Sequence, residues 1–157
     1  MSERRARAIV PVRVWVGLGA ALLVVLVLAA PWMAAHRWIE VSLLIRQFFS
    51  PVCHQDTMRS FWFWGAPAAV CARCLGIYLG AAVGAFAKID RRLAIWAFAI
   101  MLLVNCVDAV SEFVGWHGSL PQVRFALGVM LGVSISALVA SAMQVKNPTQ
   151  TTPCSVS

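Results

Sequence analysis

Charged residues are scarce in this sequence, and acidic residues are the scarcest of them. Of the 157 residues, 12% are charged, with six Asp or Glu against thirteen Lys or Arg. A soluble domain normally carries about 25% charged residues. Hydrophobic residues make up 61% of the chain instead, and this excess predicts a surface that faces lipid.

The signatures of several enzyme classes are also missing. The chain contains no GxSxG, HExxH or Walker A pattern, so it gives no support for a serine hydrolase, a zinc protease or a phosphate-loop NTPase. Its net charge of +7 lies beside apolar runs and not on a soluble basic face. We therefore expect a lipid bilayer as partner and no nucleic acid.

Residues 14–35 form an uncharged run that follows four arginines. This run is long enough to cross a hydrocarbon core, which needs about 20 residues. The alternative is a cleaved signal peptide, because the basic start and the Ala-rich end resemble one. The run is longer than the ~7–15 residues of a signal core, and we therefore predict a transmembrane helix.

The next segment, residues 38–49, has apolar residues at helical spacing that are interrupted by Glu40, Arg46 and Gln47. This pattern favours a short helix that lies in the membrane interface. The aromatic cluster at residues 61–64 is typical of side chains at the headgroup level.

Three further spans are predicted over residues 67–87, 93–114 and 122–143, with Pro67 at the first position of its helix. The predicted fold class is all-α, an integral membrane four-helix bundle with a short interfacial helix between helices one and two. We expect a basic cytoplasmic amino-terminal segment over 1–13, a single transmembrane domain over 14–145 and a disordered tail over 146–157.

Basic residues predict the orientation. If the amino terminus is cytoplasmic, most of them lie on the inner side, as the positive-inside rule requires. The protein would then lie in the cytoplasmic (inner) membrane with both termini inside and its cysteine-rich stretch on the extracytoplasmic side. The inner residues would be Arg4, Arg5, Arg7, Arg13, Lys88, Arg91, Arg92 and Lys146.

Small residues at four-residue intervals predict the helix packing. Gly76, Gly80 and Gly84 mark the predicted helix 67–87, and Gly128 and Gly132 mark the helix 122–143. Such stripes let two backbones approach closely in lipid. We expect these two helices to pack along their stripes. The other face of helix 67–87 then carries Cys71, Cys74 and Tyr78.

Polar residues within the helix 93–114 should face the protein interior, because a carboxylate in lipid needs a partner. Asn105, Asp108 and Glu112 share one face at helical spacing. We predict an ion pair between Asp108 and an arginine. The surrounding polar shell of the site would be Arg59, Arg73, Asp108 and Arg124.

Cys53, His54, Cys71 and Cys74 are the candidate metal ligands. Three cysteines and one histidine are an ordinary tetrahedral zinc set, and a CxxC pair supplies two ligands from one helical turn. Zinc or a similar transition metal is the predicted cofactor. Of the other thiols and histidines, Cys106 and Cys154 are expected to have no role at the site, and His117 is expected to be an interfacial polar residue.

The same cysteines support thiol chemistry. A cysteine at a helix amino terminus beside an arginine has its thiolate favoured, and Cys71 meets both conditions. Cys71 and Cys74, with Cys53 as third partner, could cycle between dithiol and disulfide. The chain would then be a membrane thiol-disulfide oxidoreductase coupled to a quinone-like carrier. A third possibility is a non-catalytic membrane subunit or assembly factor in which these thiols only staple the fold.

Two segments resemble an uncharacterised prokaryotic multi-pass membrane family, DUF2085. They are Cys53-His54-Gln55 with the nearby Arg59-Ser60-Phe61, and the run CARCLGIYLG that begins at Cys71. The later Asp108 and Arg124 match as well. The resemblance covers residues 48–132. It implies a membrane class and this choice of site residues, and it implies no activity.

Overall fold

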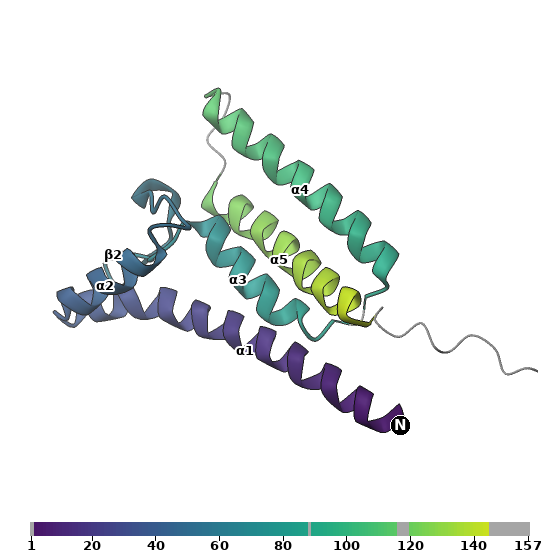
Figure 1. Cartoon of the computed structure of the whole chain (residues 1–157). Coiled ribbons are helices and arrows are strands. Elements are labelled where there is room, and N and C mark those ends of the chain that lie inside the picture. Colours follow the sequence, from purple (N-terminus) through teal and green to yellow (C-terminus); the bar gives the residue numbers. More distant parts are fainter. Residues whose placement is uncertain (1, 88, 116–119, 145–157) are drawn as a thin grey trace, which may run out of the picture.

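A computed structural model describes residues 2–87, 89–115 and 120–144. Helices make up most of these residues, as predicted (Figure 1). In chain order the elements are α1 (Ser2–Ala35), α2 (Ile39–Phe49), the 3-10 turn η1 (Thr57–Arg59), β1 (Trp62–Phe63), β2 (Ala66–Pro67), α3 (Ala72–Gly84), α4 (Arg91–Phe113) and α5 (Pro121–Gln144).

Among the described residues, three helices are long and apolar enough to cross a membrane. The candidate spans are Arg13–Ala35, Arg91–Ser111 and Pro121–Ala142, in α1, α4 and α5. These three agree with the prediction. The fourth predicted span is represented by α3, whose 13 residues cover about 20 Å at 1.5 Å per residue. This length is less than the ~30 Å of a hydrocarbon core, so α3 does not confirm a fourth full span.

The predicted helix start at Pro67 is wrong, because Pro67 ends a short β-hairpin. Trp62 pairs with Pro67 across the hairpin. Trp64 and Gly65 form its turn and have positive φ angles of 51° and 78°, as a tight two-residue hairpin turn requires. Residues 68–70 then continue as irregular chain, and α3 begins only after Cys71, its extended N-cap.

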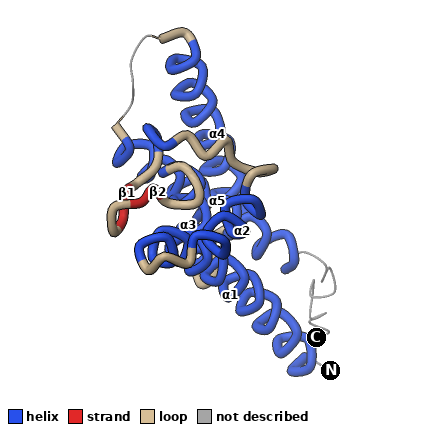
Figure 2. The backbone as a smooth tube through the Cα atoms, turned by 90° about the vertical axis from the view of Figure 1, so that its left-hand side faces the viewer, coloured by secondary structure: helices blue, strands red, loops and turns tan. Residues whose placement is uncertain are grey.

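The long helices pack in the order α1, α3, α5, α4; α1 and α4 run in one direction, and α3 and α5 run in the other (Figure 1). The contact between α3 and α5 is the most extensive. This row does not confirm the four-helix bundle that the sequence predicted. The short helix α2 and the β-hairpin lie together at the end of the molecule where α1 finishes and α3 begins (Figure 1). This end faces the viewer in Figure 2.

The close approach of α3 and α5 follows the predicted glycine stripes. A Cβ atom added to Gly80 would lie 2.9 Å from Val129 Cα, and one added to Gly132 would lie 2.9 Å from the backbone nitrogen of Ala81. Both distances are too short for real side-chain contacts. The two backbones therefore touch where neither helix carries a side chain, and the predicted packing is confirmed.

The turn between α1 and α2 sets the position of α2. Arg37 adopts a left-handed φ of 66° just after α1 ends, and Ser42 Oγ donates a hydrogen bond of 2.8 Å to the carbonyl oxygen of Ala30. α2 thus folds back on α1. Its buried residue Phe49 joins Val27 and Ala30 in the core beneath the thiols, while most of its other apolar side chains are exposed.

Candidate metal centre

Three cysteine sulfurs meet at the end of the molecule that carries α2 and the hairpin. The Sγ atoms of Cys53, Cys71 and Cys74 all lie within 4.8 Å of one another. Cys53 is buried, with 6% of its surface exposed, and its sulfur accepts a hydrogen bond of 3.2 Å from the backbone N–H of Cys71. The structure therefore joins a loop cysteine to the CxxC pair.

Local chain geometry brings these sulfurs together. After α2 the chain turns at Ser50-Pro51, and the backbone N–H of Cys53 donates to the carbonyl oxygen of Phe49 at 3.0 Å. This turn directs Cys53 inward. Cys71 and Cys74 lie one helical turn apart at the start of α3 and pack, with Tyr78, against the core on the side of α1 and α2. The predicted orientation away from the glycine stripe is confirmed.

The thiol expected to ionise first is Cys53 and not Cys71. Hydrogen bonding from the Cys71 thiol, and then from the Cys74 thiol, lowers the pKa of the Cys53 thiol well below its usual value. The same interaction with Cys53 raises the pKa of the Cys71 thiol. The sequence predicted the favoured thiolate on Cys71, whereas these directions favour it on Cys53. The reason is that the N–H group of Cys71 at the start of α3 points to the sulfur of Cys53.

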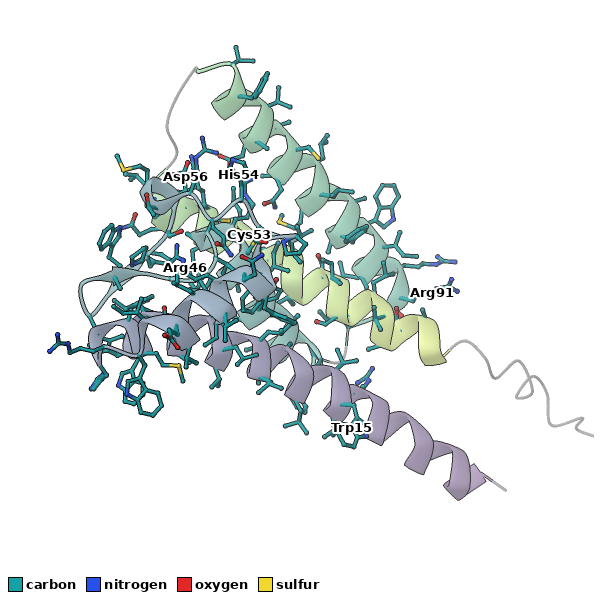
Figure 3. All side chains as sticks on the ribbon, turned by 60° about the vertical axis from the view of Figure 1, so that its left-hand side comes forward. Trp15, Arg46, Cys53, His54, Asp56 and Arg91 are labelled. Atoms are coloured by element: carbon teal, nitrogen blue, oxygen red, sulfur yellow. The ribbon has the colours of Figure 1, made fainter. Side chains whose placement is uncertain are left out.

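A polar cavity of about 180 Å³ adjoins the thiols. Figure 3 shows His54 and Asp56 beside Cys53 at this end, with Arg91 near the opposite end of the row. The side chain of His54 is exposed. It lines the cavity but does not belong to the group of three sulfurs. The cavity is lined by Cys53, His54, Gln55, Asp56, Arg59, Cys71, Arg73 and Arg124.

Arginines of the predicted polar shell surround this cavity. Arg73 Nη2 donates to the carboxylate of Asp108 on α4, which confirms the predicted ion pair between Asp108 and an arginine. Arg59 pairs with Asp56 at 2.9 Å. Arg124 is almost fully buried, with 5% of its surface exposed. Three of the four predicted shell residues therefore line the cavity, and Asp108 holds one of them.

Asn105 lies on the same side of α4 as Asp108. Its Nδ2 donates a hydrogen bond of 3.4 Å to the carbonyl oxygen of Leu127 on α5. The side chain of Glu112, together with His117 and Cys154, lies outside what the structure describes. Cys106 is exposed on α4, away from the three sulfurs.

Two cavity residues were not predicted as part of the site. Asp56 accepts a hydrogen bond of 3.0 Å from the backbone N–H of Met58 and so caps η1. Its position three residues before Arg59 was a signal for an ion pair that sequence reasoning did not use. Gln55 has a left-handed φ of 54° and donates to the carbonyl oxygen of Arg46. No pattern in the sequence indicated that backbone conformation.

The three sulfurs fit a soft or borderline metal ion. Zinc–sulfur bonds of about 2.3 Å in a tetrahedron place the ligand sulfurs about 3.8 Å apart. The observed upper limit of 4.8 Å requires only small side-chain movements to reach that spacing. Three thiolates leave one position of the tetrahedron to a further group, and the polar cavity lies beside them.

Comparisons with known proteins find a matching family and uncharacterised relatives. The model of the family described as "Predicted membrane protein (DUF2085)" matches residues 53–138. An uncharacterised protein of Methanocaldococcus jannaschii is 31% identical over 121 residues, which cover 68% of this chain and 76% of that protein. An uncharacterised protein of Methanothermobacter thermautotrophicus is 33% identical over 95 residues, 57% of this chain and 86% of that protein. No solved structure matches the chain.

Proposed function

Because the chain belongs to the DUF2085 family of predicted membrane proteins, we propose that it is a membrane metalloprotein. Its thiol centre, made of Cys53, Cys71 and Cys74, binds a zinc-like metal ion. The observation that carries this proposal is the convergence of three sulfurs within 4.8 Å from two segments that are separated in sequence by the β-hairpin. The fourth ligand would be the imidazole of His54 or a molecule held in the cavity.

Partial burial favours a bound metal over three free thiols. Cys53 is buried and the other two are half-buried, so the ligands are largely shielded from competing water. Metal binding requires deprotonated thiols, and the N–H group of Cys71 already supports a thiolate on Cys53. A metal ion at this point would tie the loop after α2 to the start of α3.

The test is the metal content of the full chain purified in detergent without chelators. Elemental analysis should find about one zinc-like ion per chain, and Cys53→Ser or Cys74→Ser should reduce it to background. Cys106→Ser is the matched control, because this thiol is exposed on α4, and it should retain the metal. A folded wild-type protein without metal, even after zinc is supplied, would overturn the proposal.

Thiol–disulfide exchange is the second candidate, and the same short distances between the sulfurs favour it. Two thiols of the group would lose two electrons and two protons to an oxidant as their sulfurs bond. The quinone-like carrier stays a prediction. Intact-mass analysis of metal-free protein before and after a mild oxidant tests this candidate, since a reversible loss of two hydrogens should occur in Cys106→Ser and not in the double variant Cys71→Ser/Cys74→Ser, which keeps only one thiol of the group. Thiols that stay reduced would exclude it and leave the staple role.

The proposed topology has the amino terminus on the cytoplasmic side of an inner membrane and the thiol centre on the extracytoplasmic side. It rests on the basic residues near the start of α1 and the start of α4. A thiol reagent that cannot cross membranes should label Cys53 or Cys71 in intact cells once metal is removed. Labelling that requires permeabilised cells would reverse the proposed orientation.

A further inference from the structure

We propose that the cavity beside the three thiols binds a small oxyanion, a phosphate or carboxylate group, which fills the open coordination position of the metal. This inference deepens the proposed function and rests on the metal site. It assigns the cavity arginines a ligand, and it leaves His54 as a wall of the cavity and not as the fourth ligand.

The walls of the cavity present guanidinium groups. Arg59, Arg73 and Arg124 all line it, and each comes from a different part of the fold: η1, α3 and α5. Arginine presents several N–H donors in a planar fork that matches phosphate and carboxylate oxygens. Three such groups beside one metal site form a convergent set of donors.

Two of these arginines are shielded from water. Arg124 has 5% of its surface exposed. Arg73 is also largely buried, and although its Nη2 is bound to Asp108, its Nε has no hydrogen-bond partner in the protein and no contact with solvent. A buried N–H group without a partner is costly. A ligand oxygen that reached it from the cavity would remove that cost.

Charge around the cavity permits an anion. A zinc ion with three thiolates has a net charge of −1, and this charge alone would repel an anion. The three arginines offset this negative charge and also the negative charges of Asp56 and Asp108. An entering oxyanion therefore meets a neutral site with arginines in its lining, in a partly enclosed place where hydrogen bonds to charged groups are strong.

Size and coordination agree with a small ligand. A cavity of about 180 Å³ is comparable to the ~150 Å³ that holds one benzene molecule. The exposed side chain of His54 lies outside the sulfur group, so the fourth position is open toward the cavity. Open metal positions are typical of sites that exchange ligands.

Cobalt(II) provides the test, because its visible and thiolate charge-transfer bands report each change of ligand. The full chain in maltoside detergent, free of phosphate and carboxylate, is loaded with Co²⁺ and titrated with inorganic phosphate or acetate. A saturable shift of the bands is expected. Arg124→Gln should weaken anion affinity about tenfold or more, and the more exposed Arg59→Gln should weaken it less.

Arg91→Gln is the matched control, because it removes the same charge at the opposite end of α4 (Figure 3), and it should leave the titration unchanged. His54→Gln should retain the Co²⁺ charge-transfer bands. In nanodiscs of phosphatidylglycerol, bands already shifted before titration would identify a lipid phosphate as the source, whereas a shift only after titration would identify a free ion. Either result supports the oxyanion site.

Three results would overturn the inference. The first is a Co²⁺ spectrum that no anion or lipid changes. The second is loss of Co²⁺ from His54→Gln, since the histidine would then be the fourth ligand. The third is an anion affinity that neither Arg124→Gln nor Arg59→Gln lowers. Failure of the wild-type protein to bind Co²⁺ at all would instead overturn the proposed metal function, so the two failures are distinguishable.

Discussion

Gly80→Ala should destabilise the protein through the interface of α3 with α5. A Cβ atom at this position would lie 2.9 Å from both Cα and the carbonyl carbon of Val129, and closer still to its carbonyl oxygen. Ordinary contacts begin at 3.4 Å, so the two backbones would have to separate by at least 0.5 Å, the difference between these values. The nearest atoms to Gly80 all belong to the backbone of Val129, so no flexible side chain could move instead.

The expected loss is about 1–3 kcal/mol, the usual cost of an added methyl group in a well-packed interior. A gap of about 0.5 Å already removes roughly a quarter of the attraction between facing atoms, and the stripe runs the length of α3. Gly19→Ala is the matched control, because nothing lies within 4 Å of the corresponding Cβ position on α1. Both variants gain the same helix propensity, so their difference reports the packing.

The measurement is unfolding of each variant in mixed micelles with increasing sodium dodecyl sulfate, followed by far-ultraviolet circular dichroism. The transition of Gly80→Ala should occur at a lower detergent fraction than that of wild type or Gly19→Ala. If Gly80→Ala is as stable as Gly19→Ala, then α3 and α5 do not approach as closely as described and the packing argument fails.

Three further predictions use the same unfolding assay. Asp108→Asn should cost about 1–3 kcal/mol, because it leaves the largely buried Arg73 without its carboxylate; an unchanged transition would mean that water already screens the pair. Ser42→Ala should cost about 1 kcal/mol by removing the buried hydrogen bond to the carbonyl oxygen of Ala30, and no loss would show that α2 is held by apolar contacts alone. Gly65→Ala should cost about 1–2 kcal/mol through its left-handed φ of 78°, although nothing crowds the position; a neutral result would argue against the hairpin turn.

Several features of this fold were predictable because they depend on local spacing. Glycines at four-residue intervals expose bare backbone on one side of a helix, and Gly80 and Gly132 lie at the contact for that reason. The Arg73–Asp108 pair was predictable in kind, since a carboxylate within an apolar helix needs a cation. Which of three arginines would reach Asp108 depended on the tertiary arrangement.

Other features depend on contacts that no sequence pattern records. Pro67 suits the first turn of a helix, but the hairpin and the bond from Arg46 Nη1 to the carbonyl oxygen of Pro67, at 3.0 Å, hold it in a strand. The order of the helices was equally hidden, because lipid-facing and protein-facing apolar residues are the same residue types. The three sulfurs were predicted to meet, whereas the exposed position of His54 follows from the course of one loop.

The shortness of α3 has a consequence for where solutes can reach. If α1, α4 and α5 cross the hydrocarbon layer, α3 leaves about 10 Å of its thickness to chain that is not helical. Such chain is tolerated at membrane depth only when protein covers it, and residues 68–70 are indeed fully buried. The chain that leads to the sulfurs at the head of α3 is thus covered by protein, and the polar cavity beside these sulfurs is where a solute would meet them.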